Sequence, residues 1–179
     1  AVIGGGVGTA IAYPVAKKLH DDGCHVDLIV GFRNKDLIIL KEEFEAASTN
    51  LIIGTDDGSY GKKALVTDLL KEQIEAGVKY DRVIAIGPVI MMKFVCLLTK
   101  EYGIPTVVSM NPIMIDGTGM CGGCRLTVGG ETKFACVDGP EFDGHLVDFD
   151  ESMARGAMYR DFELHAREET CNLFKQEVK

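Results

Sequence analysis

The chain has 179 residues, a formal net charge of −8 and 46% hydrophobic residues. This length can bury one substantial core with a small additional unit, and the acidic balance argues against nucleic acid and anionic membrane surfaces as partners. No apolar run approaches the roughly 20 residues that a membrane span needs, and no signal peptide opens the sequence. We therefore expect a soluble protein that binds neither nucleic acid nor a membrane.

The first 112 residues alternate short apolar runs with helical patterns. The predicted strands cover 1–4, 24–30, 50–54, 82–86 and 105–109, and the predicted helices cover 7–22, 35–47, 66–76 and 89–102. Apolar strands separated by helices predict a parallel sheet covered on both faces, with right-handed crossovers. The predicted fold class is therefore α/β, with a five-stranded, parallel, doubly wound sheet.

The loop after the first strand is rich in glycine. It contains Gly4, Gly5, Gly6, Val7, Gly8 and Thr9. Ligands of such folds bind at the carboxyl ends of the strands, where glycines let the backbone approach a phosphate and the next helix N-terminus attracts the anion. Thr9 stands in the place of the third glycine of the dinucleotide fingerprint, and no acidic residue ends the second strand. This loop predicts phosphate binding, with a plain tight turn as the alternative.

Three further loops are expected at the same edge of the sheet. They supply Arg33 after the second strand, Asp56, Asp57 and Gly58 after the third, and Gly87 and Pro88 after the fourth. Two aspartates after a strand are often only a solvated turn. Several polar or glycine-rich loops at one edge nevertheless favour a nucleotide site over unrelated turns.

Ligand-type residues follow the fifth strand with a characteristic spacing. Asp116, Cys121, Cys124 and Cys136 form the pattern Asp-x4-Cys-x2-Cys-x11-Cys. Plant-type [2Fe–2S] ferredoxins use Cys-x4-Cys-x2-Cys…Cys, so this is the same spacing with aspartate in the first position. A zinc site, a redox dithiol at Cys121 and Cys124, and three unrelated buried thiols are the alternatives. The pattern favours the iron–sulfur cluster.

The segment between the second and third of these cysteines predicts a β-hairpin. Residues 125–128 and 131–136 are strand-like, and Gly129-Gly130 is a two-residue turn between them. Such a hairpin would return Cys136 to the glycine-rich loop that carries Cys121 and Cys124.

Cysteine use also bears on the compartment. Six cysteines in a secreted protein would suggest disulfides, but three belong to the ligand pattern, and Cys24 and Cys96 fall inside predicted core elements. Cys171 has no other ligand residue near it and is interpreted as a free thiol. A reducing, cytoplasmic compartment is the simpler expectation.

Taken together, these motifs resemble a known family. The segments 4–10, 54–59 and 85–88 are similar to the pyridine-nucleotide domain of the ferredoxin–NADP reductase superfamily. Segments 116–124 and 134–145 narrow the resemblance to the small subunits of NADH-dependent ferredoxin:NADP oxidoreductases, also called sulfide dehydrogenases. More distantly, the chain resembles dihydroorotate dehydrogenase electron-transfer subunits and hydrogenase diaphorase subunits.

The resemblance implies a cluster ligand set of Asp116, Cys121, Cys124 and Cys136. It implies a nucleotide domain at 1–112, a [2Fe–2S] domain at 113–150 and a helical tail at 151–179. It also implies NAD(P) with its pyrophosphate over the glycine loop, its adenosine ribose near Arg33 and its nicotinamide near Gly87 and Pro88.

Members of this family begin with a β-barrel that holds FAD, whereas this sequence begins inside the first predicted strand. We therefore expect a fragment that lacks turnover by itself. In the intact protein, electrons would pass from NAD(P)H through FAD and the cluster to a larger iron–sulfur flavoprotein or hydrogenase-type subunit. A zinc-stabilised nucleotide-binding module and a non-catalytic assembly subunit are the alternative functions.

Overall fold

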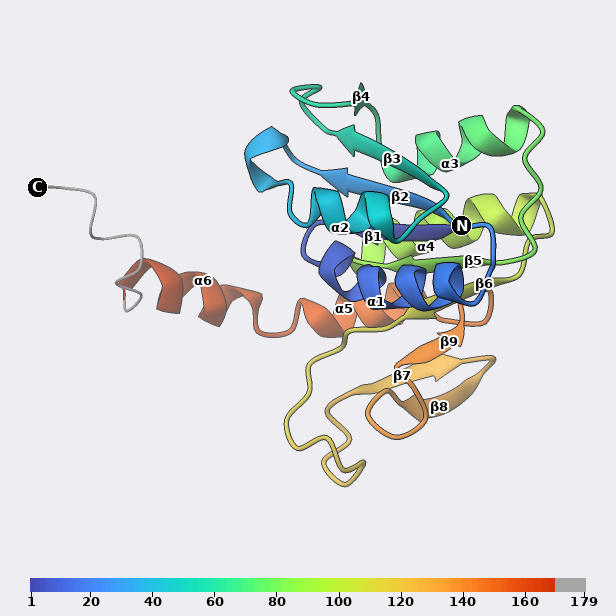
Figure 1. The fold of residues 1–179 in the computed structure, drawn as a ribbon. Helices are drawn as coiled ribbons and strands as arrows, with labels where there is room; N and C mark the ends of the chain where they lie inside the picture. Colours follow the sequence, from blue (N-terminus) through green and yellow to red (C-terminus); the bar gives the residue numbers. More distant parts are fainter. Residues whose placement is uncertain (170–179) are drawn as a thin grey trace, which may run out of the picture.

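The computed structural model describes residues 1–169, and Figure 1 shows their arrangement. The strands are β1 (Val2–Gly5), β2 (Asp27–Phe32), β3 (Asn50–Thr55), β4 (Lys62–Lys63), β5 (Val83–Ile86), β6 (Thr106–Ser109), β7 (Arg125–Val128), β8 (Glu131–Phe134) and β9 (Glu141–Asp143). The helices are α1 (Gly8–Asp21), the 3₁₀ turn η1 (Lys35–Leu37), α2 (Lys41–Ala46), α3 (Val66–Glu75), α4 (Val89–Glu101), α5 (Phe149–Gly156) and α6 (Arg160–Glu169). Among these, no helix is long and apolar enough to span a membrane.

The main sheet has the strand order β4-β3-β2-β1-β5-β6-β9. Its five central strands, β3, β2, β1, β5 and β6, are parallel, so the predicted α/β doubly wound sheet is confirmed. Helices α1 and α2 cover one face, and α3 and α4 cover the other (Figure 1). The chain moves outward from β1 in one direction and then restarts at β5 on its other side, which creates a topological switch point between β1 and β5.

Alternating side chains of the central strands fill two separate cores. In β2, Leu28 and Val30 pack with Ala12, Ala16 and Phe44 on the α1 and α2 face. Because successive strand residues point to opposite faces, the intervening Ile29 packs on the α3 and α4 face. Burial on both faces explains why these strands are almost wholly apolar rather than alternating.

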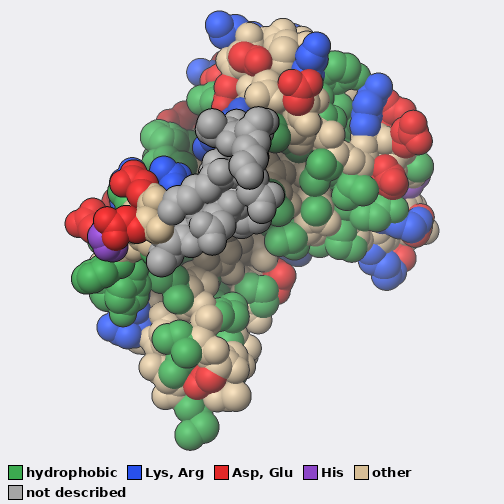
Figure 2. Space-filling model, turned by 90° about the vertical axis from the view of Figure 1, so that its left-hand side faces the viewer, with side chains coloured by type: hydrophobic (Ala, Val, Ile, Leu, Met, Phe, Trp, Pro, Cys, Tyr) green, Lys and Arg blue, Asp and Glu red, His purple; other side chains and the backbone are tan. Residues whose placement is uncertain are grey.

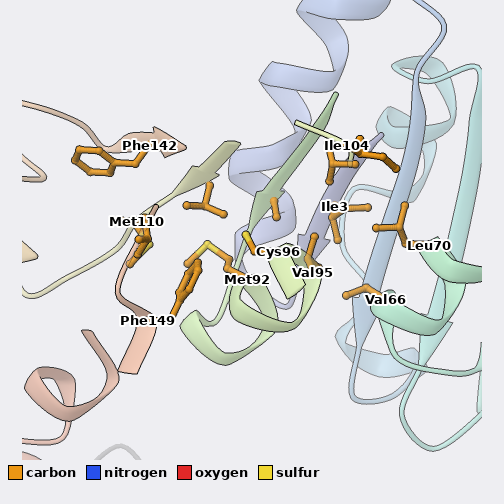
Figure 3. Close-up of a cluster of buried hydrophobic side chains, with 14 of the residues drawn as sticks. Ile3, Val66, Leu70, Met92, Val95, Cys96, Ile104, Met110, Phe142 and Phe149 are labelled. Carbon is orange, nitrogen blue, oxygen red and sulfur yellow. The ribbon is translucent and has the colours of Figure 1, made fainter. Parts of the chain in front are cut away.

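The core under α3 and α4 continues into the C-terminal part of the chain. Figure 3 shows Met92, Cys96 and Met110 in one cluster with Phe142 and Phe149. The same cluster includes buried residues of the predicted cluster segment, namely Cys124, Leu126, Ala135 and Val147. Residues 111–149 therefore share apolar contacts with the main sheet instead of forming a core of their own.

The edges of the sheet differ from the prediction. Two residues of β4 pair in parallel with β3, and β9 pairs antiparallel with β6, so the sheet has seven strands instead of five. In β9, Phe142 lies opposite Val108 and is buried, whereas its neighbours Glu141 and Asp143 are exposed. One apolar residue in three gives too little periodicity for a strand to be recognised from sequence.

Three predicted boundaries are wrong. The second strand begins at Asp27 rather than residue 24, because Gly23 adopts φ +86° and Cys24 is exposed in the turn that follows α1. The predicted helix over 35–47 is divided into η1 and α2, because Leu40 between them adopts φ 53°. The predicted tail helix is two helices, α5 and α6, and its end together with Cys171 lies outside the described residues.

Candidate nucleotide and iron–sulfur sites

The predicted loops meet at one edge of the sheet. Because β1, β2, β3, β5 and β6 are parallel, their carboxyl ends place Gly5, Arg33, Asp56, Gly87 and Met110 along that edge. The glycine loop after β1 and the Gly87-Pro88 loop after β5 border the switch point. This is the position where open α/β sheets hold dinucleotides.

Backbone contacts fix the glycine loop at the start of α1. The amide of Gly6 donates to the carbonyl of Gly31 at 2.9 Å, and the Thr9 hydroxyl donates to the carbonyl of Gly6 at 2.7 Å. Gly6 adopts φ +54°, which an L side chain disfavours. Thr9 is fully buried, so its hydroxyl stabilises the loop through the bond to Gly6 and is not accessible to a ligand.

The first turn of α1 has the electrostatics of an anion site. It contains no acidic residue, and Val7, at the N-cap position, provides no side-chain cap. The backbone donors at this end therefore face no competing carboxylate of their own helix. Val7 is 81% exposed, which leaves the approach to these donors open.

Gly8 and Gly87 bring the two loops of the switch point into contact. A Cβ atom on Gly8 would lie 2.7 Å from both the Cα of Gly87 and the carbonyl oxygen of Ile86. A Cβ atom on Gly87 would lie 3.1 Å from the amide nitrogen of Gly5. These glycines are therefore required for close backbone packing, and the two loops form a single surface.

A backbone hydrogen bond joins the loops after β2 and β3. The amide of Asp57 donates to the carbonyl of Arg33 at 3.3 Å, which places the exposed Arg33 and Asp57 side by side. The Asp57 carboxylate accepts from the Ser59 amide at 2.9 Å, and hydrogen bonding by Ser59 lowers the pKa of Asp57. The cationic Arg33 and the anionic Asp57 thus lie together at the carboxyl ends of β2 and β3. This is where the family resemblance predicts the adenosine ribose.

The hairpin of β7 and β8 places two of the cysteines in contact. Gly129 and Gly130 adopt φ +61° and +81°, as the predicted two-residue turn requires. The amide of Ala135 donates to the carbonyl of Cys124 at 3.2 Å, and the sulfur atoms of Cys124 and Cys136 lie 3.3 Å apart. Cys124 is buried and Cys136 is half-buried.

The other two predicted ligands lie in the preceding loop. Asp116 is exposed; the Thr118 amide donates to its carboxylate at 2.9 Å, and this bond, with a smaller contribution from Cys121, lowers the pKa of Asp116. Cys121 is exposed as well, and its sulfur accepts from the Gly123 amide at 3.4 Å. The structure thus brings the candidates together as two pairs, Cys124 with Cys136 and Asp116 with Cys121.

Within residues 1–169, no three carboxylate, imidazole or thiol side chains already form a complete metal site. The donor set nevertheless fits an iron–sulfur cluster, because three thiols and a carboxylate with a lowered pKa occupy one glycine-rich loop and the adjoining hairpin. Gly117, Gly119 and Gly122 all adopt positive φ, which lets the loop wrap around a compact group and turn its amides inward.

A cavity lies beside the cysteine loop. It has a volume of about 390 Å³ and is lined from one side by Val89 at the start of α4 and from another by Gly123 of the cysteine loop. Arg125, Arg155 and Tyr159 also line it. The cavity therefore lies between the start of α4, the cysteine loop and α5, and its walls are largely apolar with two guanidinium groups.

Sequence reasoning missed Arg125 and Arg155. The guanidinium of Arg125 donates to the carbonyl of Gly122 at 3.1 Å, and that of Arg155 donates to the carbonyl of Gly123 at 3.4 Å. Arg125 lies beside Cys124 in the sequence and could have been suspected. Arg155 could not, because only the packing of α5 brings it to the loop.

Two families match this chain. Residues 2–97 match the family described as "Oxidoreductase NAD-binding domain". Residues 111–148 match the family described as "Iron-sulfur cluster binding domain of dihydroorotate dehydrogenase B". The matches fall on the two regions that carry the candidate nucleotide and cluster residues.

Curated relatives extend the similarity across both regions. The chain is 62% identical to a Clostridium beijerinckii protein named only by its position in the adh 3′ region, over 88% of this chain and 54% of that protein. It is 51% identical to a Thermotoga maritima homologue of the electron transfer subunit of dihydroorotate dehydrogenase B (NAD(+)), over 90% of this chain and 57% of the relative. The chain thus spans little more than half the length of these relatives.

Solved structures agree with the fold. A chain from the structure of an NADH-dependent reduced ferredoxin-NADP oxidoreductase, described in the context of flavin-based electron bifurcation, superposes with a TM-score of 0.86 at 49% identity. That match covers 93% of this chain and 60% of the other. The chain therefore belongs to the oxidoreductase NAD-binding domain family, and it joins that domain to a cluster-binding segment of the dihydroorotate dehydrogenase B type.

Proposed function

We propose that this chain is the nucleotide- and cluster-binding part of an electron-transfer subunit in a flavin-dependent iron–sulfur oxidoreductase. The observation that carries the proposal is that the cysteine loop follows β6 at the same carboxyl edge of the sheet that carries the glycine loop and the Gly87-Pro88 loop. We assign nucleotide binding to residues 1–112, cluster binding to 113–150 and, within the part of the chain that the structure describes, a helical tail to 151–169.

In the nucleotide site, Gly5, Gly6, Val7, Gly8 and Thr9 provide the loop for the pyrophosphate. The start of α1 offers backbone donors without a competing acidic residue in its first turn, which suits a doubly charged phosphate pair. Along the carboxyl edge of the sheet, Gly87 and Pro88 lie at the inner end of this site, and Arg33, Asp56, Asp57 and Gly58 lie at its outer end. This order would orient the nicotinamide toward the cavity and the adenosine ribose away from it.

The preference between NAD and NADP depends on the outer end. Arg33 would attract a 2′-phosphate, whereas Asp57 beside it would repel one and accept hydrogen bonds from ribose hydroxyls. We propose NAD, and expect Asp57→Asn to strengthen NADPH binding relative to NADH in fluorescence titrations. NADPH binding more tightly than NADH in the unmodified protein would contradict this choice.

In the cluster site, Asp116, Cys121, Cys124 and Cys136 would be the ligands. A [2Fe–2S] cluster, when bound, supplies one-electron transfer. The chain's own contribution is to hold Cys124 and Cys136 opposite each other through the hairpin and to direct the amides of the glycine loop toward sulfur. A carboxylate in place of one thiolate changes ligand softness at one iron.

The cavity suits the flavin of the intact protein. A flavin accepts two electrons from a nicotinamide and releases them singly, so it must lie between the nucleotide and the cluster. Met110, Ile113 and Ile115 provide apolar walls here, and Arg125 and Arg155 provide positive charge. We propose that this surface contacts FAD held mainly by a part of the protein outside this chain.

The cysteine loop also suits contact with a partner. Met120 is 89% exposed and Ile115 75% exposed, and Met114 and Val137 are exposed beside them. Figure 2 shows hydrophobic side chains on the lower lobe, which is the part of the molecule built by this loop and the hairpin. We propose that a larger iron–sulfur flavoprotein or hydrogenase-type subunit docks there, in a reducing, cytoplasmic compartment that keeps the thiols free.

Anaerobic purification followed by iron and sulfide analysis tests the cluster directly. We expect about two irons and two sulfides per chain, and an EPR signal after reduction by dithionite. Cys124→Ser should abolish the signal, whereas Cys24→Ser, a matched change at an exposed thiol outside the loop, should retain it. Zinc in place of iron, or no metal after anaerobic reconstitution, would contradict the proposed function.

A further inference from the structure

Helix α5, which follows the hairpin of the candidate cluster site, is attached to that hairpin by hydrogen bonds. The Asp148 carboxylate caps this helix by accepting from the Glu151 amide at 2.9 Å. The Glu151 carboxylate in turn accepts from the amide of Thr127, in strand β7, at 3.0 Å. The amide of Asp148 also donates to the carbonyl of Thr127 at 2.9 Å. These contacts set the position of α5 relative to the cysteine loop.

Arg155 lies one helical turn after Glu151 and therefore on the same face of α5. Its Nη2 donates to the carbonyl of Gly123 at 3.4 Å, and its side chain is only partly exposed. Gly123 lies between Cys121 and Cys124, and its own amide donates to the sulfur of Cys121 at 3.4 Å. A single glycine thus connects the guanidinium of Arg155 with a candidate ligand.

A positive charge in this position has two physical consequences. The hydrogen bond to Gly123 restrains the peptide that joins two ligands, so it favours one geometry of the loop. Reduction of a cluster adds one negative charge, which a nearby guanidinium stabilises more strongly where water is partly excluded. The guanidinium is suited to this because it is always charged and directs its donors in a fixed plane.

We propose that Arg155 is a positioning residue that raises the reduction potential of the cluster and holds its ligand loop. This inference rests on the proposed function, since it requires a cluster at the four predicted ligands. It assigns a role to helix α5, which lies outside both the ligand motif and the nucleotide site. Arg125 is a weaker candidate because it is exposed and already adjoins the loop in sequence.

The test compares Arg155→Gln, Arg155→Lys and Arg160→Gln, the last being an exposed arginine on α6. Each protein is purified anaerobically, its iron and sulfide content is measured, and its midpoint potential is determined by a dye-mediated titration followed by EPR. We expect Arg155→Gln to shift the potential to lower values, Arg155→Lys to restore part of the shift, and Arg160→Gln to match the unmodified protein.

The other possible results of this experiment also support or overturn the proposed role of Arg155. An iron-loaded Arg155→Gln protein with the unmodified potential would overturn the inference. Loss of iron from Arg155→Gln with retention in Arg155→Lys would support it, because the charge is then what stabilises the loaded loop. Equal loss from both variants would overturn it and indicate a packing role for the side chain. Absence of iron from the unmodified protein would instead contradict the proposed function.

Discussion

Single glycines decide whether the two loops of the switch point can form one surface. Gly8 is helical and would contact backbone atoms of Ile86 and Gly87 if it carried a Cβ atom, so neither flexible side chains nor a rotamer change could relieve the overlap. Gly8→Ala should therefore displace the start of α1. We expect a loss of about 1–3 kcal/mol in the free energy of unfolding, together with weaker NADH binding.

Urea unfolding and fluorescence titration with NADH measure these two effects. Gly156→Ala is the matched control, because a Cβ atom there would meet nothing within 4 Å and the residue ends helix α5. That change should stabilise the protein by about 0.5–1 kcal/mol through the lower backbone entropy of the unfolded chain. Equal stability and equal NADH affinity for Gly8→Ala and the unmodified protein would refute the close-packing role.

At the scale of elements, the β7–β8 hairpin determines where Cys136 lies relative to Cys124. Its turn requires positive φ at both glycines, and a Cβ atom on Gly130 would meet no other atom within 4 Å. Any effect of Gly130→Val is therefore conformational, and a β-branched residue at this φ costs about 1–2 kcal/mol. We expect lower iron content per chain after anaerobic reconstitution of Gly130→Val.

Gly129→Asn provides the contrasting change in the same turn. Asparagine tolerates positive φ, and Asn-Gly is a preferred pair for a two-residue hairpin. The Asn variant should retain full iron content, so the pair separates turn geometry from a general effect of substitution. Equal iron content in both variants would show that the register of the hairpin does not control the cysteines.

Elements with strong local signals were predictable from the sequence, and elements defined by distant contacts were not. The central strands were recognisable because they are apolar on both faces, and the hairpin because Gly129-Gly130 permits only a few turns. Strand β9 depends on the contact of Phe142 with Val108, and the break before α2 depends on the left-handed conformation of Leu40. Neither feature leaves a local pattern in the sequence.

In the candidate sites, too, features with a local sequence signal were predictable and features set by distant contacts were not. The glycine loop and the cysteine spacing identified which residues to examine, because ligands of a compact group need fixed intervals and free backbone. The pairing of Cys124 with Cys136, the close contact of Gly8 with Gly87 and the approach of Arg155 all require the folded chain. The identity of the candidate binding residues was therefore predictable from the sequence, whereas their arrangement in space was not.

At the scale of the whole molecule, polar groups gather at both ends of the parallel strands. The candidate sites lie at the carboxyl ends of the strands. At the amino ends lies a buried carboxylate, Asp27, which is the first residue of β2 and is 2% exposed. Its oxygens accept from the hydroxyl of Tyr80 at 2.7 Å and from the amide of Asn50 at 2.7 Å, and one lies 2.9 Å from the imidazole of His25. One side chain thus connects β2, β3 and the segment before β5.

This arrangement predicts how stability depends on pH. Burial opposes ionisation of Asp27, but the hydrogen bonds from Tyr80, Asn50 and His25 outweigh it, and the pKa of Asp27 is lowered. A carboxyl whose pKa is lower in the folded state stabilises the protein above its unfolded pKa of about 3.9, and this contribution is lost as the pH falls through the folded value. Acid should therefore lower the free energy of unfolding by removing the contribution of Asp27 at the amino ends of the strands.

Asp27→Asn tests this at the level of the whole fold. Removing the charged acceptor of the hydrogen bonds from Tyr80, Asn50 and His25 should cost about 1–3 kcal/mol in the free energy of unfolding near neutral pH. The difference from the unmodified protein should shrink as the pH falls below the unfolded pKa of about 3.9 and through the lower pKa of the folded state, where the native carboxyl also becomes protonated. Urea unfolding as a function of pH measures both effects, with Asp36→Asn as an exposed carboxylate for comparison. A difference that stays constant with pH would show that the side chain acts by packing alone, because only a change in ionisation between the folded and unfolded states makes stability depend on pH.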